Sequence, residues 1–130
     1  MSLATPAKKR PKNLNLATIR LPLPAIVSIL HRFSGAALFL FGIPFLLWVL
    51  SCSLARQEGF DRWRDIFGNP LLKIILIGFL WAYLHHFCAG IRHLVMDLHI
   101  GLEIEAARAT SYAVMGVSVA LMAVIGMMLW

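Results

Sequence analysis

The sequence predicts an all-α integral membrane protein with three transmembrane helices. The chain has 130 residues, of which 60% are hydrophobic and 14% are charged, and a soluble domain of this size does not need so much apolar surface. Three stretches contain no Asp, Glu, Lys or Arg, namely residues 33–55, 74–91 and 109–130. At about 1.5 Å rise per residue, each stretch with its flanks is long enough to cross a hydrocarbon core of about 30 Å as a helix.

The predicted elements lie along a single membrane domain, 1–130. They are, in order, a basic head (1–24), helix I (about 25–54), an outer interfacial segment (55–69), helix II (about 70–99) and helix III (about 107–130). Pro22 and Pro24 mark a stretch that is not yet helical. Phe60, Trp63 and Phe67 recur at helical spacing between charged residues, which predicts a short helix lying at the membrane interface.

Local patterns refine helices II and III. Asn69-Pro70 is typical of an N-cap with proline in the first turn, so we expect helix II to begin there. Helix III carries small residues at steps of three or four, which predict a packing face: Ala113, Gly116, Ala120, Ala123 and Gly126. Because its span has no ionisable group except Tyr112, we expect the chemistry to lie on helices I and II.

Positive charge predicts the orientation of the three spans. The net charge is +6, and alternating spans leave more Lys and Arg residues on the side of the N-terminus than on the other. The N-terminal side holds Lys8, Lys9, Arg10, Lys12, Arg20, Arg32, Arg92 and Arg108, and the other side holds Arg56, Arg62, Arg64 and Lys73. By the positive-inside rule the N-terminus is cytoplasmic and Trp130 lies outside. The basic head is therefore interpreted as a topology signal that contacts lipid, and not as a nucleic-acid arm.

Helix II carries a stripe of polar side chains. At about 100° per residue, four residues fall within about 60° of arc: His86, Gly90, His93 and Asp97. Ionisable residues inside a membrane are costly and usually face the interior of the bundle, so the stripe is a candidate site. The alternative is that His93, Asp97 and His99 only lie at the cytoplasmic interface, where polar side chains cost little.

His86 lies deepest, about 10 Å further into the span than the next histidine of the stripe. The pattern leaves two interpretations, a hydrogen-bonding residue between helices or an axial ligand of haem. Small residues nearby leave room for a flat macrocycle and favour the second: Ala82, Ala89 and Gly90. A haem held by two histidines needs a second imidazole at the same depth. We expect His31 near the cytoplasmic mouth of helix I, so the second histidine would come from another chain.

Two motifs open helix I and fill helix II. "SILHRFSG" fits S-x-x-H-R-x-[ST]-G, and "HFCAGIRHLVMD" fits H-x-x-x-G-x-R-H-x-x-x-D. With these motifs at this separation, and over nearly its whole length, the chain resembles the cytochrome b556 subunits of succinate dehydrogenase, the larger membrane anchors of respiratory complex II. The head reads "RPKNLNL" where many relatives have R-P-x-S-P-H. This departure fits the bacterial branch. The resemblance and the distribution of positive charge together imply a multi-pass protein of the bacterial inner membrane with a periplasmic C-terminus.

The resemblance implies a role for each matching residue. His86 is the implied axial ligand of one haem b, shared with a partner subunit. The implied ubiquinone contacts are Ser28, Arg32 and Asp97, and the implied neighbours of the haem propionates are His31, Arg32 and His93. A hydroxyl and a fixed cation suit a quinone oxygen that becomes more basic as it is reduced. The structural alternatives are an N-cap for Ser28 and a snorkelling membrane anchor for Arg32.

The resemblance also implies partners. The chain would form half of a heterodimeric anchor bundle, with a second three-helix anchor supplying the other histidine. An iron–sulfur subunit and a flavoprotein would complete the succinate dehydrogenase, and a trimer of such heterotetramers is compatible with it. Succinate oxidation would occur on the flavoprotein, because this chain alone has no complete catalytic site. The alternatives are the anchor of a fumarate reductase, or a non-redox scaffold or transporter subunit whose polar stripe serves packing or an ion path.

Overall fold

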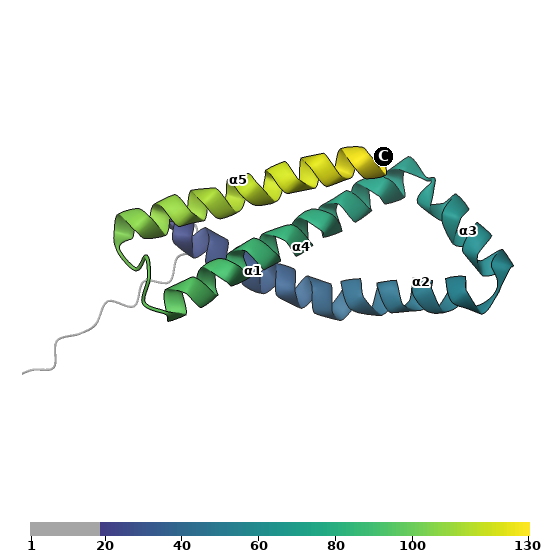
Figure 1. Cartoon of the computed structure of the whole chain (residues 1–130), viewed down its shortest axis with the longest axis horizontal. Coiled ribbons are helices and arrows are strands. Elements are labelled where there is room, and N and C mark those ends of the chain that lie inside the picture. The colour runs from purple at the N-terminus through teal and green to yellow at the C-terminus, as the bar shows by residue number, and fades with distance from the viewer. Residues whose placement is uncertain (1–18) are drawn as a thin grey trace, which may run out of the picture.

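The structure, a computed structural model, describes residues 19–130 and is built of helices joined by short turns (Figure 1). The predicted contacts of Lys8, Lys9, Arg10 and Lys12 with a membrane surface fall outside the described residues. Three helical runs are long and apolar enough to cross a membrane: Leu23–Ala55, Pro70–Asp97 and Ile104–Leu129. The predicted all-α fold with three potential transmembrane helices is confirmed.

Helix I is a continuous run made of three parts. These are α1 (Leu23–Ala37), the π-helical η1 (Leu38–Gly42) and α2 (Ile43–Ala55). The run starts slightly before the predicted residue 25, because proline is favourable in the first turn of a helix, where its missing N–H is not needed. Pro44 is the second residue after the π-helical segment, at the start of α2. Inside an α-helix a proline ring clashes with the carbonyl four residues back, which for Pro44 is that of Leu40 within η1, and a wider π-helical turn relieves such a clash.

Two further helices follow the first span. The amphipathic α3 covers Gln57–Phe67, within the segment that the aromatic spacing indicates. The longer α4 covers Pro70–Asp97, and the side-chain oxygen of Asn69 accepts a hydrogen bond from the Leu71 amide at 2.9 Å. This bond satisfies one of the free N–H groups of the first turn, so the predicted N-cap is confirmed.

The last helix, α5, covers Ile104–Leu129 and begins three residues before the predicted start. Glu105 stands in its first turn, where a carboxylate interacts favourably with the positive end of the helix dipole. The preceding turn has positive φ at His99 (61°) and at Gly101 (75°). His99 therefore lies outside the helix, in the turn that reverses the chain.

The helices do not form a uniform bundle (Figure 1). Along its length α4 packs on α5, it crosses α1, and α1 also contacts α5. By contrast α2 diverges from α4, and within residues 19–130 it contacts only α3 and η1. The short α3 then bridges the separated ends of α2 and α4. All three spans meet only around α1, so the tightest part of the fold lies at the end where helix I begins.

The interior is as polar as it is apolar, while the exterior is rich in large apolar side chains. The buried apolar residues are Val27, Val49, Leu84, Ala89 and Val114, and the buried polar residues are Ser34, His85, Arg92, Ser111 and Ser118. This is the opposite of a soluble domain, whose apolar residues are gathered inside. It fits a lipid environment, in which helices associate through small and polar residues.

Most of the small-residue stripe of α5 is exposed in this chain, so its role as a packing face stays a prediction. Ala113, Gly116, Ala120 and Ala123 are exposed, and only Gly126 is buried, against Ile77. The face of α5 that packs on α1 and α4 carries Ser111, Val114 and Ser118 instead. Hydroxyls that bond to their own helix fill this face as compactly as alanine does.

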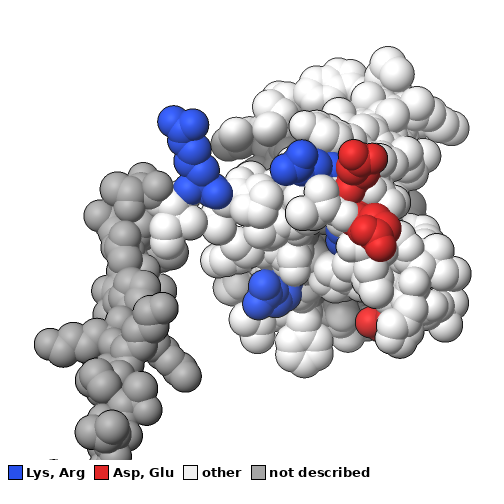
Figure 2. Space-filling view, turned by 90° about the vertical axis from the view of Figure 1, so that its left-hand side faces the viewer, with Lys and Arg blue, Asp and Glu red and all other residues white. Residues whose placement is uncertain are grey.

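Charged side chains of both signs gather at the end where helix I begins, α4 ends and α5 begins (Figure 2). The described charged residues of these segments are Arg20, Arg32, Arg92, Arg108, Asp97, Glu103 and Glu105. A rim of charges at the ends of apolar helices is expected where helices leave the hydrocarbon core.

Candidate functional site

The centre of the candidate site is a pair of stacked imidazoles. The ring of His31 on α1 lies against the ring of His86 on α4, with centroids 4.2 Å apart and planes inclined by 7°. The expectation that His31 lies well away from the level of His86 is wrong. Because α1 begins at Leu23, His31 already lies about 12 Å along the helix axis. The antiparallel α4 brings His86 to the same level.

The environment of His86 fixes which ring nitrogen carries a hydrogen. Its Nδ1 lies 2.9 Å from the carbonyl oxygen of His31. A carbonyl only accepts hydrogen bonds, so Nδ1 is the donor and the neutral ring has its free lone pair on Nε2. His86 itself is half-buried. Among the described residues, the side-chain nitrogens that are fully enclosed without a hydrogen-bond partner belong to Trp81 and His85, and Nε2 of His86 is not one of them.

Ser34 completes this local network, and sequence reasoning assigned it no role. Its Oγ donates to the His31 carbonyl at 3.0 Å and lies 3.3 Å from Nδ1 of His86. Ser34 is 8% exposed. The only signal in the sequence was the [ST] position of the helix I motif, three residues after His31.

Two glycines admit the imidazoles to the contact between α1 and α4. A Cβ atom at Gly35 would stand 2.7 Å from Cε1 of His86, closer than van der Waals contact permits. A Cβ atom at Gly90 would stand 3.5 Å from Nε2 of His31. The space predicted beside Gly90 is therefore partly taken by the His31 ring. The sequence identified the small residues of helix II but not Gly35, which lies directly against His86.

Other predicted site residues surround the pair to different degrees. The ring of His93 lies 5.0 Å from that of His31 between centroids, so three histidines form one cluster. Next to it, Nε of the exposed Arg32 donates to the Ser28 carbonyl at 3.4 Å, which keeps these two residues on one face of α1. Asp97 lies exposed at the end of α4, one turn beyond His93.

His85, in contrast, points away from the cluster, as the helical spacing predicts. It is 1% exposed, and neither of its nitrogens has a hydrogen-bond partner among the described residues. Its ring lies 5.4 Å from that of Trp81, between centroids. His85 therefore belongs to the packed interior, while its neighbour His86 faces α1.

Arg92 has a structural contact that the sequence did not reveal. It is 7% exposed, although it lies within the charged end of α4. Its Nε donates to Oγ1 of Thr110 at 3.0 Å, and its Nη2 donates to the Ala107 carbonyl at 3.3 Å. The guanidinium thus joins α4 to the first turns of α5. It points toward α5, whereas His86 of the cluster faces α1.

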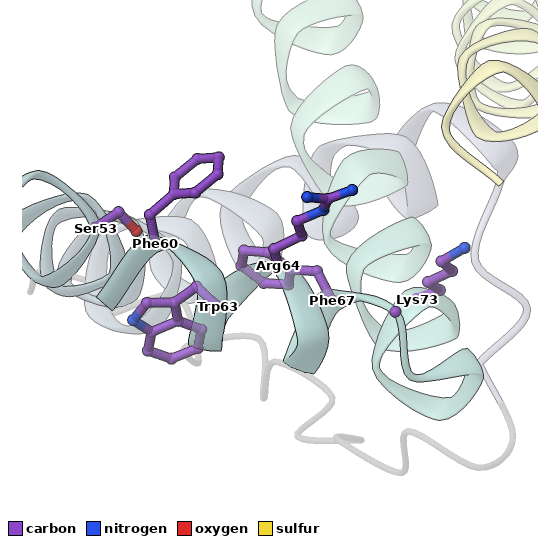
Figure 3. Close-up of a pocket in the computed structure, with 7 residues that line it drawn as sticks. Ser53, Phe60, Trp63, Arg64, Phe67 and Lys73 are labelled. Atoms are coloured by element: carbon purple, nitrogen blue, oxygen red, sulfur yellow. The ribbon is translucent and has the colours of Figure 1, made fainter. Parts of the chain in front are cut away.

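A separate pocket of about 410 Å³ lies near the other end of the helices (Figure 3). It is lined by Ser53, Phe60, Trp63, Arg64, Phe67, Gly68 and Lys73. The Lys73 ammonium donates to the Trp130 main-chain oxygen at 2.8 Å and stands 5.2 Å from the centre of its indole ring. None of the predicted site residues lines this pocket, so the histidine cluster remains the candidate site.

Three apolar helices around clustered imidazoles define an all-α integral membrane protein with a histidine site between two of its spans. The chain belongs to the succinate dehydrogenase/fumarate reductase transmembrane subunit family, whose model matches residues 6–125.

Curated relatives agree over most of the chain. A protein of Paracoccus denitrificans is 40% identical over 112 residues, which cover 86% of this chain and 85% of the relative. One of Rickettsia felis is 36% identical over 122 residues, covering 94% and 91%. One of Coxiella burnetii is 37% identical over 123 residues, covering 94% and 98%. Each is a succinate dehydrogenase cytochrome b556 subunit.

Proposed function

We propose that this chain is the membrane anchor and cytochrome b subunit of a succinate:quinone oxidoreductase. In this role it binds one haem b together with a partner anchor and contributes to the site of ubiquinone reduction. The observation that carries the proposal is the bond from Nδ1 of His86 to the His31 carbonyl. Histidines that ligate metals commonly donate their other N–H in this way, which fixes the tautomer and makes the ligating nitrogen more basic. The name cytochrome b556, which the relatives carry, supports the same cofactor.

The residues around His86 fit an axial ligand of haem. Its Nε2 is the unprotonated nitrogen, and the small residue Gly35 lets the ring approach α1 closely. His31 does not serve as the opposite ligand, because the lone pairs of two stacked rings lie in their own parallel planes and do not point at each other. A second histidine that holds the haem would come from the partner anchor. Haem bound here supplies one-electron transfer.

The residues at the rim of the cluster suit the propionate edge. Haem propionates are anions, and donors such as Arg32, His31 and His93 form strong charge-assisted hydrogen bonds with carboxylates. The two histidines lie 5.0 Å apart between ring centroids. Arg32 is exposed on the turn that contains His31. A planar, permanently charged guanidinium is well suited to such a position.

Ser28 and Arg32 are proposed to hold the quinone. Reduction of a quinone takes up two electrons and two protons, and negative charge develops on its oxygens. The Arg32 guanidinium would stabilise this charge, while the Ser28 hydroxyl would donate a hydrogen bond that orients the ring. Asp97 lies exposed near the same end and is proposed to exchange protons with water there.

The remaining proposals concern orientation and assembly. The basic residues favour a cytoplasmic N-terminus and a periplasmic C-terminus in the bacterial inner membrane. The companions would be a second three-helix anchor, an iron–sulfur subunit and a flavoprotein, and three heterotetramers would be able to associate. The family also includes fumarate reductase anchors. The names of the relatives favour succinate oxidation.

Purification of the tagged chain from its own membranes in mild detergent tests this function. We expect a second small membrane subunit, an iron–sulfur protein and a flavoprotein to co-purify, and a reduced-minus-oxidised spectrum to show a b-type band. A chain that purifies without these companions and without haem would favour the non-redox scaffold or transporter subunit.

Gly35→Ala tests the close approach of α1 to the proposed ligand. Alanine is favoured over glycine in a helix by about 1 kcal/mol, yet its Cβ would stand 2.7 Å from Cε1 of His86. We expect the ring to move and the haem content per flavin to fall, since overpacking costs about 1–3 kcal/mol. Gly78→Ala is the matched control, because its Cβ would meet nothing within 4 Å. Equal haem content in both variants would contradict the proposed contact.

A further inference from the structure

We propose that Ser34 is a positioning residue for the haem ligand, setting the orientation of the His86 imidazole and its electron donation to iron. The inference rests on the proposed function of His86. It goes beyond that function because it concerns a hydroxyl that would touch neither haem nor quinone. It starts from three contacts that join three atoms in pairs: the Ser34 Oγ, the carbonyl oxygen of His31 and Nδ1 of His86.

The direction of each hydrogen bond follows from the chemistry of the atoms. The His31 carbonyl accepts from Nδ1 at 2.9 Å and from the Ser34 hydroxyl at 3.0 Å. Since Nδ1 carries the hydrogen, the Ser34 oxygen at 3.3 Å acts as a second acceptor for the same N–H. The three groups close a small ring of hydrogen bonds. The Nδ1–H group of His86 is thereby held by two acceptors, and Nε2 lies on the other side of the ring from Nδ1.

A serine that only bonds to its own helix would not need to contact a side chain on another helix. Serines in membrane helices often bond to a carbonyl three or four residues back, as Ser118 does to Met115 at 3.1 Å. Ser34 makes the same local bond to His31, but it also reaches a side chain on another helix. Both hydroxyls are buried. Ser34 therefore differs from Ser118 chiefly in its contact with His86.

The consequence for the ligand has a definite sign. An acceptor on Nδ1–H gives an imidazole more anionic character, which stabilises oxidised iron more than reduced iron. Removing one of two acceptors should therefore raise the midpoint potential of the haem. Loss of such an outer partner typically weakens metal binding about 10–100-fold, so haem should also be lost more readily.

The experiment compares Ser34→Ala, Ser34→Thr and Ser118→Ala in the purified complex. Redox titration of the b-type band should give a higher midpoint potential for Ser34→Ala, with about tenfold faster haem loss during detergent washing. Ser34→Thr keeps the hydroxyl and should restore both values. Ser118→Ala removes another buried hydroxyl, one that bonds only to its own helix, and should leave both unchanged.

Each failure has a separate meaning. If wild-type protein shows no haem band, the proposed function itself is overturned. If Ser34→Ala retains its haem at the wild-type potential, or if Ser118→Ala shifts it equally, the positioning role is overturned. Should Ser34→Ala not assemble, Ser34→Cys replaces it, since a thiol is a weaker hydrogen-bonding group. An unchanged potential in Ser34→Cys would then overturn the role.

Discussion

Replacing His86 with alanine is expected to abolish the b-type absorption band of the purified complex. The methyl group of alanine provides no lone pair, and neither His31 nor His85 is placed to replace His86. His31 is stacked on it face to face, and His85 is enclosed on another side of α4. The measurement is a reduced-minus-oxidised spectrum normalised to flavin, which reports haem for each assembled complex.

His85→Phe is the matched control for this experiment. His85 is the chain neighbour of His86, but both of its nitrogens are buried without a partner. Replacing an unpaired buried polar group with an apolar ring of similar shape is often neutral or stabilising. We expect the band to persist in His85→Phe. The haem assignment would be wrong if the band disappeared in this variant and survived in His86→Ala.

The second large effect is expected from Arg32→Ala. Without the guanidinium, succinate-driven quinone reduction should fall about 100-fold or more, the usual cost of removing one stabilising donor from a developing charge. Reduction of an artificial dye by the flavoprotein should be spared, because it needs no quinone site. The two activities are measured on the same preparation.

Arg108→Ala controls for a general loss of positive charge. Arg108 is exposed near the start of α5, at the same end of the molecule. We expect this variant to retain quinone reduction. If Arg32→Ala lost dye reduction and quinone reduction in equal measure, the defect would be one of assembly, and Arg32 would have no assigned role at the quinone.

Much of the fold follows from the sequence, because its determinants are local. Long apolar stretches predict helices in lipid, and Asn69 followed by proline predicts the start of α4, which the Asn69 cap confirms. The level of His31 was not predictable in the same way. It depends on where α1 begins and on the axial register between α1 and α4. Neither can be read from the residue spacing within one helix. The stacked pair results from that register.

In the candidate site, too, features within one helix could be predicted from the sequence, and contacts between helices could not. A spacing of one residue on α4 puts His85 about 100° around the helix from His86, so the separation of these two side chains follows from the sequence. The contacts of Ser34 and Gly35 with His86 cross between helices, and a short serine or a glycine has no distinctive pattern of its own. Arg92 was misleading for a similar reason. A charge near a helix end suggests solvent, yet this guanidinium is enclosed by Thr110 and the Ala107 carbonyl.

The two turns of α1 from Ser28 to Gly35 have a consequence for genetics. One face of this segment joins Arg32 to the Ser28 carbonyl, and another presents the carbonyl that binds His86. A substitution that shifts this backbone displaces both groups together. Alleles in this segment should therefore be pleiotropic, impairing growth on succinate and the cytochrome spectrum at once.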